Sequence, residues 1–248
     1  STGIVLVAEY EGKIVGTSYV KFLPLNDCWF QALRVHGDYR RLGLGNALTI
    51  ASIEHAKASG KKRAYLGIDS DNTASLTMTA RAGFSKISEY ARLLKKLPTI
   101  GSEILKEAIP LRRASTDDLN LMLKLAEEYN KREFIACWQW QPFSREALQR
   151  NTEDKHIWVQ DDPTLTLFAG FEDFEGEVHL FDPVGAPEDI LHLIHTLTNS
   201  LARQQEVTFE VWLHHQNPLI AHLIDELGFA KDDGYTIWEY PLTKATTA

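Results

Sequence analysis

The sequence has little of several features that would narrow its function. Cysteine occurs only twice, as Cys28 and Cys137, without the paired spacing of a zinc or redox site. This usage is typical of a reduced cytosolic protein. No apolar run is long enough to span a membrane, and the start, Ser1-Thr2-Gly3, lacks the basic region and apolar core of a signal peptide. We therefore expect a cytoplasmic protein that does not contact a membrane.

Positive charge is also scarce. The chain has 26 Lys and Arg and 34 Asp and Glu, which gives a net charge of −8. The imbalance lies in one half of the chain: residues 1–108 carry a net charge of +5, whereas residues 109–248 carry −13. A mildly basic first half suits a polyanionic ligand. The acidic second half argues against nucleic acid and favours cationic partners such as amines, although a solvated acidic surface explains it equally well.

The most informative stretch lies between a predicted strand and a predicted helix. Residues 29–35 are rich in aromatic and branched side chains, which is typical of a buried strand, and apolar residues recur at helical spacing from Ala47 to Ala56. Between them lies Arg40-Arg41-Leu42-Gly43-Leu44-Gly45. Glycines let a ligand approach the main chain, and the first N–H groups of a helix have no internal partners. The turn therefore predicts an anion site, strengthened by the helix dipole and two arginines.

This turn differs from two common phosphate-binding loops. It lacks the third glycine of the Rossmann fingerprint and the Gly-Lys-Ser/Thr of a P-loop. From Val35 to Gly45 it reads Val-x-x-x-x-Arg-x-x-Gly-x-Gly, which resembles the acyl-coenzyme A signature of the GNAT acetyltransferase superfamily. Taken alone, this short motif would also fit a tight strand-to-helix turn that binds nothing.

A second stretch, residues 72–84, extends the resemblance. Asn72 follows a predicted strand over residues 64–68, and Gly83-Phe84 comes eleven and twelve residues after Asn72. The family shows Asn-x-x-Ala-x-x-x-Tyr-x-x-x-Gly-Phe here. The sequence departs from this pattern with Ser75 at the Ala position and Thr79 at the Tyr position. Since both motifs occur in the family's order, the chain is identified as a member of the GNAT superfamily.

The resemblance implies an α/β fold with a mixed sheet, present in two copies. Residues 4–94 predict the order β-β-β-α-β-α-β, without the strand and two helices that begin a GNAT domain, and residues 97–102 read as a linker. The Asn…Gly-Phe pattern recurs 145 residues later, at Asn217 and Gly228-Phe229. We expect an acyl-CoA-binding GNAT domain at residues 1–100 and a degenerate GNAT-like domain at residues 101–248. Truncation or a homodimer with exchanged segments would explain the missing elements.

The second copy is not expected to bind the cofactor. In place of the glycine turn it has Gly185-Ala186-Pro187-Glu188-Asp189-Ile190. Proline is acceptable as a first helical residue but removes an N–H group from the turn. The two carboxylates suit the N-terminus of their own helix and would repel a pyrophosphate.

The resemblance also assigns roles in the first copy. It implies that acetyl-CoA is the co-substrate and that the acceptor is a primary amine of a small molecule or protein, which attacks the thioester directly. The cofactor-binding residues that it implies are Leu33, Val35, Arg40, Arg41, Leu42, Gly43, Leu44, Gly45, Asn46 and Asn72.

The sequence offers few candidate residues for acid–base catalysis. Thr79 replaces the helix Tyr with which family members often protonate the leaving thiolate, and packing explains a helix Thr better than catalysis does. Asp27 is the one acid near the position where many members carry a strand Glu, and Tyr90 is a further conceivable donor. Trp138 and Trp140 lie in the region that lines the family's substrate clefts, although packing between domains explains them equally well.

Two other functional classes stay open. An acyl-CoA-binding pseudoenzyme or sensor would hold the cofactor without turnover, and the missing Tyr favours it. A purely structural module would not bind coenzyme A, which the intact glycine turn argues against. No metal is expected, because the histidine pairs His192/His195 and His214/His215 lack further ligands at recognisable spacing.

Overall fold

The computed structural model describes residues 3–97, 111–136, 138–160, 166–174, 176–201 and 206–243. The chain forms two compact units. Unit 1 comprises residues 1–88 together with 235–248, and unit 2 comprises residues 89–234. The boundary falls within one strand, β5.

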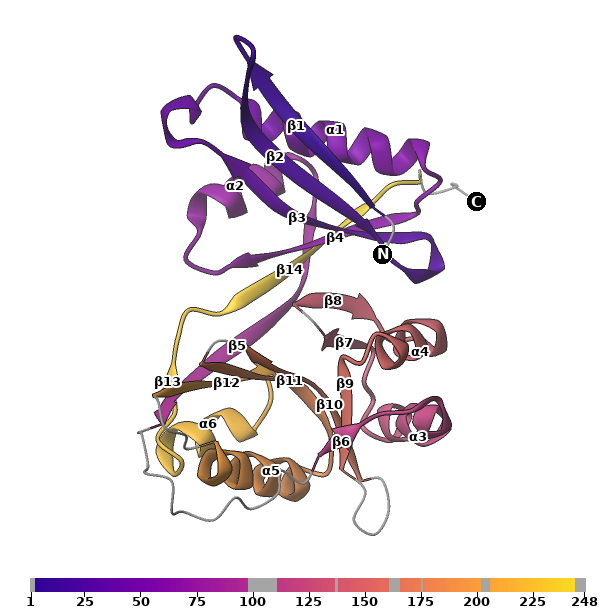
Figure 1. Ribbon diagram of the computed structural model, residues 1–248, viewed down its shortest axis with the longest axis vertical. Coiled ribbons are helices and arrows are strands. Elements are labelled where there is room, and N and C mark those ends of the chain that lie inside the picture. The colour runs from indigo at the N-terminus through magenta and orange to yellow at the C-terminus, as the bar shows by residue number, and fades with distance from the viewer. Residues whose placement is uncertain are drawn as a thin grey trace. The chain divides into compact units, whose positions relative to one another are not determined.

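Unit 1 consists of an edge hairpin, two strand–helix pairs and the last strand of the chain (Figure 1). Its elements are β1 (Gly3–Tyr10), β2 (Lys13–Phe22), η1 (Pro24–Asn26), β3 (Asp27–Val35), η2 (Gly37–Tyr39), α1 (Leu44–Ala58), β4 (Arg63–Asp69), α2 (Thr73–Arg81), the start of β5 (Ser85–Leu97) and β14 (Tyr235–Pro241). The sheet order is β1-β2-β3-β4-β14, and all neighbours are antiparallel except β3 and β4. This matches the strand and helix order predicted from the sequence.

One core holds unit 1 together. Helix α1 packs on β1, β2 and β3, because Ile53 and Ala56 share one helix face and meet the inward side chains of Val20, Cys28 and Phe30. Period-2 alternation on the strands and period-3.6 spacing on the helix place these side chains together. The result is a rigid frame behind β3, the strand that ends at the predicted anion site.

Unit 2 has a similar plan with further elements. Beyond most of β5, these are β6 (Arg112–Arg113), η3 (Thr116–Asp118), α3 (Leu119–Glu128), β7 (Glu133–Ala136), β8 (Gln139–Pro142), α4 (Arg145–Glu153), β9 (Ile157–Gln160), β10 (Leu167–Phe174), β11 (Glu177–Gly185), α5 (Pro187–Ser200), β12 (Val207–His214), α6 (Leu219–Asp225) and β13 (Ala230–Lys231). The sheet order is β5-β12-β11-β10-β9-β6, and β13 also pairs with β5. One core lies under α5 and α6, and a second lies under α3 and α4.

For two strands, β14 and β5, the order of elements in the sequence does not predict the unit to which the strand belongs. Strand β14, at the end of the chain, pairs with β4 from Tyr235 opposite Asp69 to Pro241 opposite Arg63, as Figure 1 shows by the yellow strand beside β4. Strand β5 pairs with β12 from residue 90 to residue 97. The α/β fold class is confirmed. Division into repeats at residue 100 stays a prediction, and most of the predicted linker lies outside the described residues. In the described ranges, no helix is long and apolar enough to cross a membrane.

An ion pair at the start of unit 2 gives its stability a defined pH dependence. Arg112 donates to both carboxylate oxygens of Asp118 at 2.8 and 2.9 Å, and the Ser115 N–H donates to the same carboxylate at 2.7 Å. The Arg112 hydrogen bond, with those from Ser115, lowers the pKa of Asp118 to about 2. Because the folded pKa lies below the unfolded one, the stabilisation is complete above about pH 4 and disappears as pH falls towards 2.

We therefore expect Asp118→Asn to lower the free energy of unfolding of unit 2 by about 1 kcal/mol at pH 7, since Arg112 is partly solvated. The difference from the native protein should shrink below pH 4. Urea unfolding followed by far-UV circular dichroism at pH 7 and pH 3 measures it. An equal difference at both pH values would contradict the assignment.

Candidate active site

Strands β3 and β4 are paired at one end only. Their parallel ladder joins Asp27 to Arg63, Cys28 to Ala64 and Trp29 to Tyr65, and then stops. A β-bulge explains the separation, because Ser18 on β2 faces two residues of β3, Ala32 and Leu33. Ala32 takes a positive φ of 56°. A bulge bends its strand, and here it turns the second half of β3 away from β4.

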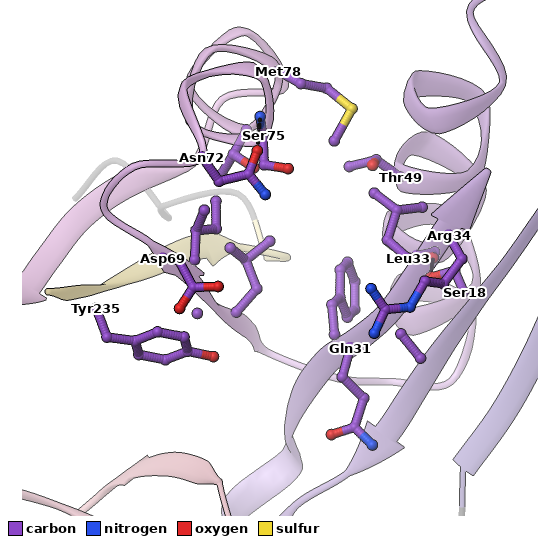
Figure 2. A pocket seen from close by; sticks show the side chains of 17 residues that line it. Ser18, Gln31, Leu33, Arg34, Thr49, Asp69, Asn72, Ser75, Met78 and Tyr235 are labelled. Atoms are coloured by element: carbon purple, nitrogen blue, oxygen red, sulfur yellow. Dashed lines mark hydrogen bonds between the residues drawn. The ribbon is translucent and has the colours of Figure 1, made fainter. Parts of the chain in front are cut away.

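The opening between the two strands is a cavity of about 220 Å³. Figure 2 shows its walls, with α2 at the top, α1 and β3 on the right, and Asp69 and Tyr235 on the left. The labelled lining side chains are those of Ser18, Gln31, Leu33, Arg34, Thr49, Asp69, Asn72, Ser75, Met78 and Tyr235. Since β3 has no partner on this side beyond Trp29, its backbone groups face a space that an extended ligand could fill.

A second, more open cavity adjoins the first at the N-terminus of α1. The two share Leu33, Arg34, Asn72, Ser75 and Met78, and the second also has Arg40, Arg41, Gly43, Gly45 and Asn46 in its wall. We call them the inner cavity and the outer cavity. Every cofactor-binding residue predicted from the sequence, apart from the exposed Leu42, lines the outer cavity.

The outer cavity has the local structure of an anion site. Gly43 takes the left-handed conformation (φ 79°) as the N-cap of α1, and the first helical bond runs from the Ala47 N–H to the Gly43 carbonyl at 3.0 Å. The N–H groups of Leu44, Gly45 and Asn46 therefore lie at the open helix end. At Gly45 a Cβ atom would come within 3.3 Å of the Met78 sulfur, so glycine keeps the space open here. Backbone donors, a helix dipole and two exposed arginines meet at one place.

Comparison with known proteins agrees with this geometry. Residues 1–84 match the model of the Acetyltransferase (GNAT) family. The mycothiol acetyltransferase of Saccharomonospora viridis is 28% identical over 101 residues, which cover 36% of this chain and 33% of that protein. The mycothiol acetyltransferase of Geodermatophilus obscurus is 31% identical over 80 residues, 30% of this chain and 26% of that protein. The chain thus aligns with a third or less of these relatives.

Two solved structures cover nearly the whole chain. A tandem GNAT protein from the clavulanic acid biosynthesis pathway aligns with 97% of this chain and 83% of its own, with a TM-score of 0.62 and 14% identity. A GCN5-related N-acetyltransferase from Sphaerobacter thermophilus aligns with 94% of this chain and 79% of its own, with a TM-score of 0.60 and 14% identity. Residues 1–84 are thus similar to the GNAT family, and the chain has the fold of tandem GNAT proteins.

In unit 1, Asn72 links the second motif to the site. Its Oδ1 accepts a hydrogen bond from the Ser75 N–H at 3.1 Å and so caps α2, and the residue lies in the wall of both cavities. In unit 2, Asn217 comes one residue before the N-cap of α6, and its Oδ1 accepts from the Leu219 N–H at 3.0 Å. Both asparagines of the sequence repeat thus accept a backbone N–H at the start of a helix, and only Asn72 borders the site.

We expect Asn72→Ala to lower the stability of unit 1 by about 1 kcal/mol, through loss of the cap, and also to weaken acetyl-CoA binding. Asn217→Ala is the matched control, since it should cost unit 2 a similar amount and leave binding unchanged. Thermal unfolding and calorimetric titration of both variants measure this. Equal binding losses in the two variants would show that stability alone is responsible.

The acid–base candidates lie in three different places. Thr79 is 2% exposed and borders the inner cavity. Asp27 lies at the opposite end of β3, where Arg63 donates to its carboxylate at 3.0 and 2.9 Å; burial nevertheless raises the Asp27 pKa. Tyr90 is buried in unit 2, donates to Glu133 at 2.8 Å and has its pKa raised by burial. Asp27 and Tyr90 do not line the inner cavity.

The two tryptophans expected near a substrate lie in unit 2. Trp140 is 4% exposed on β8. Trp138 lies in the β7–β8 turn with its ring edge-on to those of His179, Phe181 and Trp212, at centroid distances of 4.7 to 5.3 Å. Neither lines the inner or the outer cavity. Their role in substrate binding stays a prediction.

An ion pair lies at the counterpart position in unit 2. Strand β11 precedes α5 as β3 precedes α1, and the β11–β12 ladder runs from Glu177 to Phe181 and then stops. Directly after it, the buried Asp182 carboxylate accepts from Lys131 Nζ at 2.5 Å and from the His214 N–H at 3.4 Å. Pro187, Glu188 and Asp189 form the first turn of α5. Two carboxylates at this helix end do not suit a pyrophosphate, and the lack of cofactor binding by the second copy stays a prediction.

Most residues of the inner cavity were not among the sequence candidates, and Gly67, Asp69 and Tyr235 are three of these. Asp69 ends β4, and the position of an acid at the end of a predicted strand was the available signal. Tyr235 comes from the opposite end of the chain, and nothing in the local sequence connects it with residues 67–69. In the described ranges, no group of three or more His, Cys, Asp or Glu side chains has the arrangement of a metal site.

Proposed function

We propose that this protein is an N-acetyltransferase whose first GNAT domain transfers the acetyl group of acetyl-CoA to a primary amine. The observation that carries the proposal is the continuity of the two cavities: an anion-binding helix end opens onto the unpaired half of β3. Acetyl-CoA has a matching arrangement, because its pyrophosphate suits the helix end and its thioester arm suits the unpaired strand. The match of residues 1–84 to the GNAT family and the named activities of the relatives support acetyl transfer.

The chain's own residues suggest how acetyl-CoA is held. Arg40, Arg41 and the N–H groups of residues 44–46 bind the pyrophosphate, and residues 33 and 35 offer main-chain partners to the extended arm. This places the thioester near the bulge, where N–H groups of β3 can stabilise the oxyanion that forms when the amine attacks. Holding amine and thioester together supplies much of the acceleration.

The acceptor is proposed to be a small-molecule or protein amine, and not a nucleic acid, in agreement with the acidic second half of the chain. Unit 2 is proposed to have no catalytic role, because Glu188 and Asp189 lie in the first turn of α5 and would repel a pyrophosphate there. A homodimer and a cytoplasmic location stay predictions from the sequence. The second candidate function is an acyl-CoA sensor that does not turn over, which the presence of Thr79 at the usual Tyr position favours.

Calorimetric titration with acetyl-CoA, followed by a thiol-release assay over a panel of primary amines, tests the proposal. Binding together with release on at least one amine is the expected result. Binding without release on any amine would favour the sensor. No binding would exclude both and leave a structural role for the fold.

A further inference from the structure

We propose that Asp69 binds the ammonium group of the acceptor and takes its proton, and that the ring of Tyr235 positions the acceptor beside it. The proposal rests on the function proposed above and assigns the acceptor end of the same site.

Charge divides the site into two ends. Among the described residues that line the inner cavity, Asp69 is the one carboxylate and Arg34 the one guanidinium. Arg34 also lines the outer cavity with Arg40 and Arg41, whereas Asp69 does not. Figure 2 shows Asp69 and Arg34 on opposite sides of the cavity. An anionic cofactor therefore meets the basic end, and a cationic acceptor is attracted to the carboxylate.

The position of Asp69 suits a group that exchanges protons with solvent. It is the last residue of β4, where the strand has already separated from β3, and its side chain is exposed. Helix α2, which carries Asn72 and Ser75, begins four residues later. The carboxylate is thus at the mouth of the inner cavity, next to the space where the unpaired part of β3 would hold a thioester.

Tyr235 reaches this place because residue 67 is glycine. Tyr235 lies opposite Asp69 in the β4–β14 ladder, and its ring leans along β4 to cover Gly67, where any Cβ atom would collide with the ring. Glycine inside a strand weakens the strand and often marks a close approach of this kind. Burial raises the pKa of Tyr235, so its hydroxyl stays neutral and leaves the negative charge to Asp69. The ring provides an apolar and cation-attracting wall for an alkylammonium chain.

The proton and electron changes balance. The ammonium gives one proton to the Asp69 carboxylate, and the neutral amine forms the C–N bond at the thioester carbonyl carbon while the C=O π electrons move to oxygen. Collapse re-forms C=O and breaks the C–S bond. The leaving thiolate takes the second N–H proton, which gives the amide and free thiol, and Asp69 returns its proton to solvent. Turnover then does not need a Tyr at position 79, because the attacking nitrogen itself supplies the proton for the thiolate.

The first test is a binding experiment that does not depend on turnover. The protein, loaded with coenzyme A, is titrated with n-butylammonium and with neutral 1-butanol, and binding is followed by saturation-transfer NMR. We expect Asp69→Asn to weaken n-butylammonium binding at least tenfold and to leave the binding of 1-butanol unchanged. Asp71→Asn is the matched control, because Asp71 is an exposed acid two residues away that lines neither cavity. Equal binding by native protein and Asp69→Asn, or no binding by native protein, would overturn the proposal.

The second test uses whichever amine the panel identifies. At pH 7, Asp69→Asn should lower kcat/KM by about 10²- to 10⁴-fold. The loss should shrink as pH approaches the amine's own pKa of about 10, where solution supplies neutral amine. Tyr235→Ala should raise KM about tenfold with a smaller change in kcat, and Tyr235→Phe, which keeps the ring, should not. Unchanged kcat/KM in Asp69→Asn, or a loss that does not depend on pH, would refute the role of Asp69 and leave the proposed acetyltransferase function intact.

Discussion

A chain that ends at Gly234 is expected to lose the folded structure of unit 1 and all binding of acetyl-CoA, while unit 2 stays folded. The truncation removes β14, which pairs with β4 over seven residues from Tyr235 to Pro241. It also removes Ile237 and Leu242, both buried, the second of them in the core beneath α1. Strand β4 would become an open edge, with unpaired backbone groups and an uncovered apolar face.

The expected cost is on the order of 5–10 kcal/mol, the total stability of many domains. Loss of one unfolding transition in differential scanning calorimetry would show it, together with rapid amide exchange in residues 3–88 and slow exchange in β11 and β12. A chain that ends at Thr243, and so keeps β14, is the control. Native-like acetyl-CoA binding by the chain that ends at Gly234 would contradict the assignment of β14 to unit 1.

The double variant Arg41→Glu/Gly43→Asp should weaken acetyl-CoA binding by more than about 100-fold, which corresponds to about 2.7 kcal/mol. Arg41 loses its charge-assisted bonds to the pyrophosphate and becomes repulsive. Gly43 has a left-handed backbone that a side chain strains, and a new carboxylate at the end of α1 would compete with the phosphate for the same N–H groups. Calorimetric titration at fixed ionic strength measures the change.

The chain offers a control that reproduces both the strain and the charge change. Gly12, in the β1–β2 turn, has a φ of 75° and open space around it, and Lys13 follows it on the surface. Gly12→Asp/Lys13→Glu should therefore lose similar stability and leave acetyl-CoA binding within about twofold of native. An equal loss of binding in both double variants would assign the effect to folding or net charge, and not to the turn at Gly43.

The anion-binding part of the outer cavity could be predicted from the sequence because its determinants are local. A strand, a left-handed glycine and a helix N-terminus follow one another within residues 29–58. The opposite wall, from Asn72 to Met78, comes from the second motif. The first turn of α5 in unit 2 was predictable for the same reason, because Pro187, Glu188 and Asp189 are visible as the start of a helix.

The inner cavity could be predicted only in part. Its width depends on where the β3–β4 ladder stops, which follows from a bulge against β2 that no sequence pattern marks. Its far wall depends on Tyr235, which contacts residues about 170 positions earlier through strand pairing. The β7–β8 hairpin of unit 2, between α3 and α4, was likewise not expected, since its strands have only four residues each. Long-range pairing and short strands leave little trace in local sequence.

The place of β14 also sets an order of events during synthesis. The ribosome releases the first 88 residues of unit 1 early, but β14, the strand that completes their sheet, emerges only after every residue of unit 2. Nascent unit 2 can become compact as soon as its final residues leave the exit tunnel, whereas residues 3–88 cannot complete their sheet before β14 has followed. The unit whose synthesis begins first is therefore completed second.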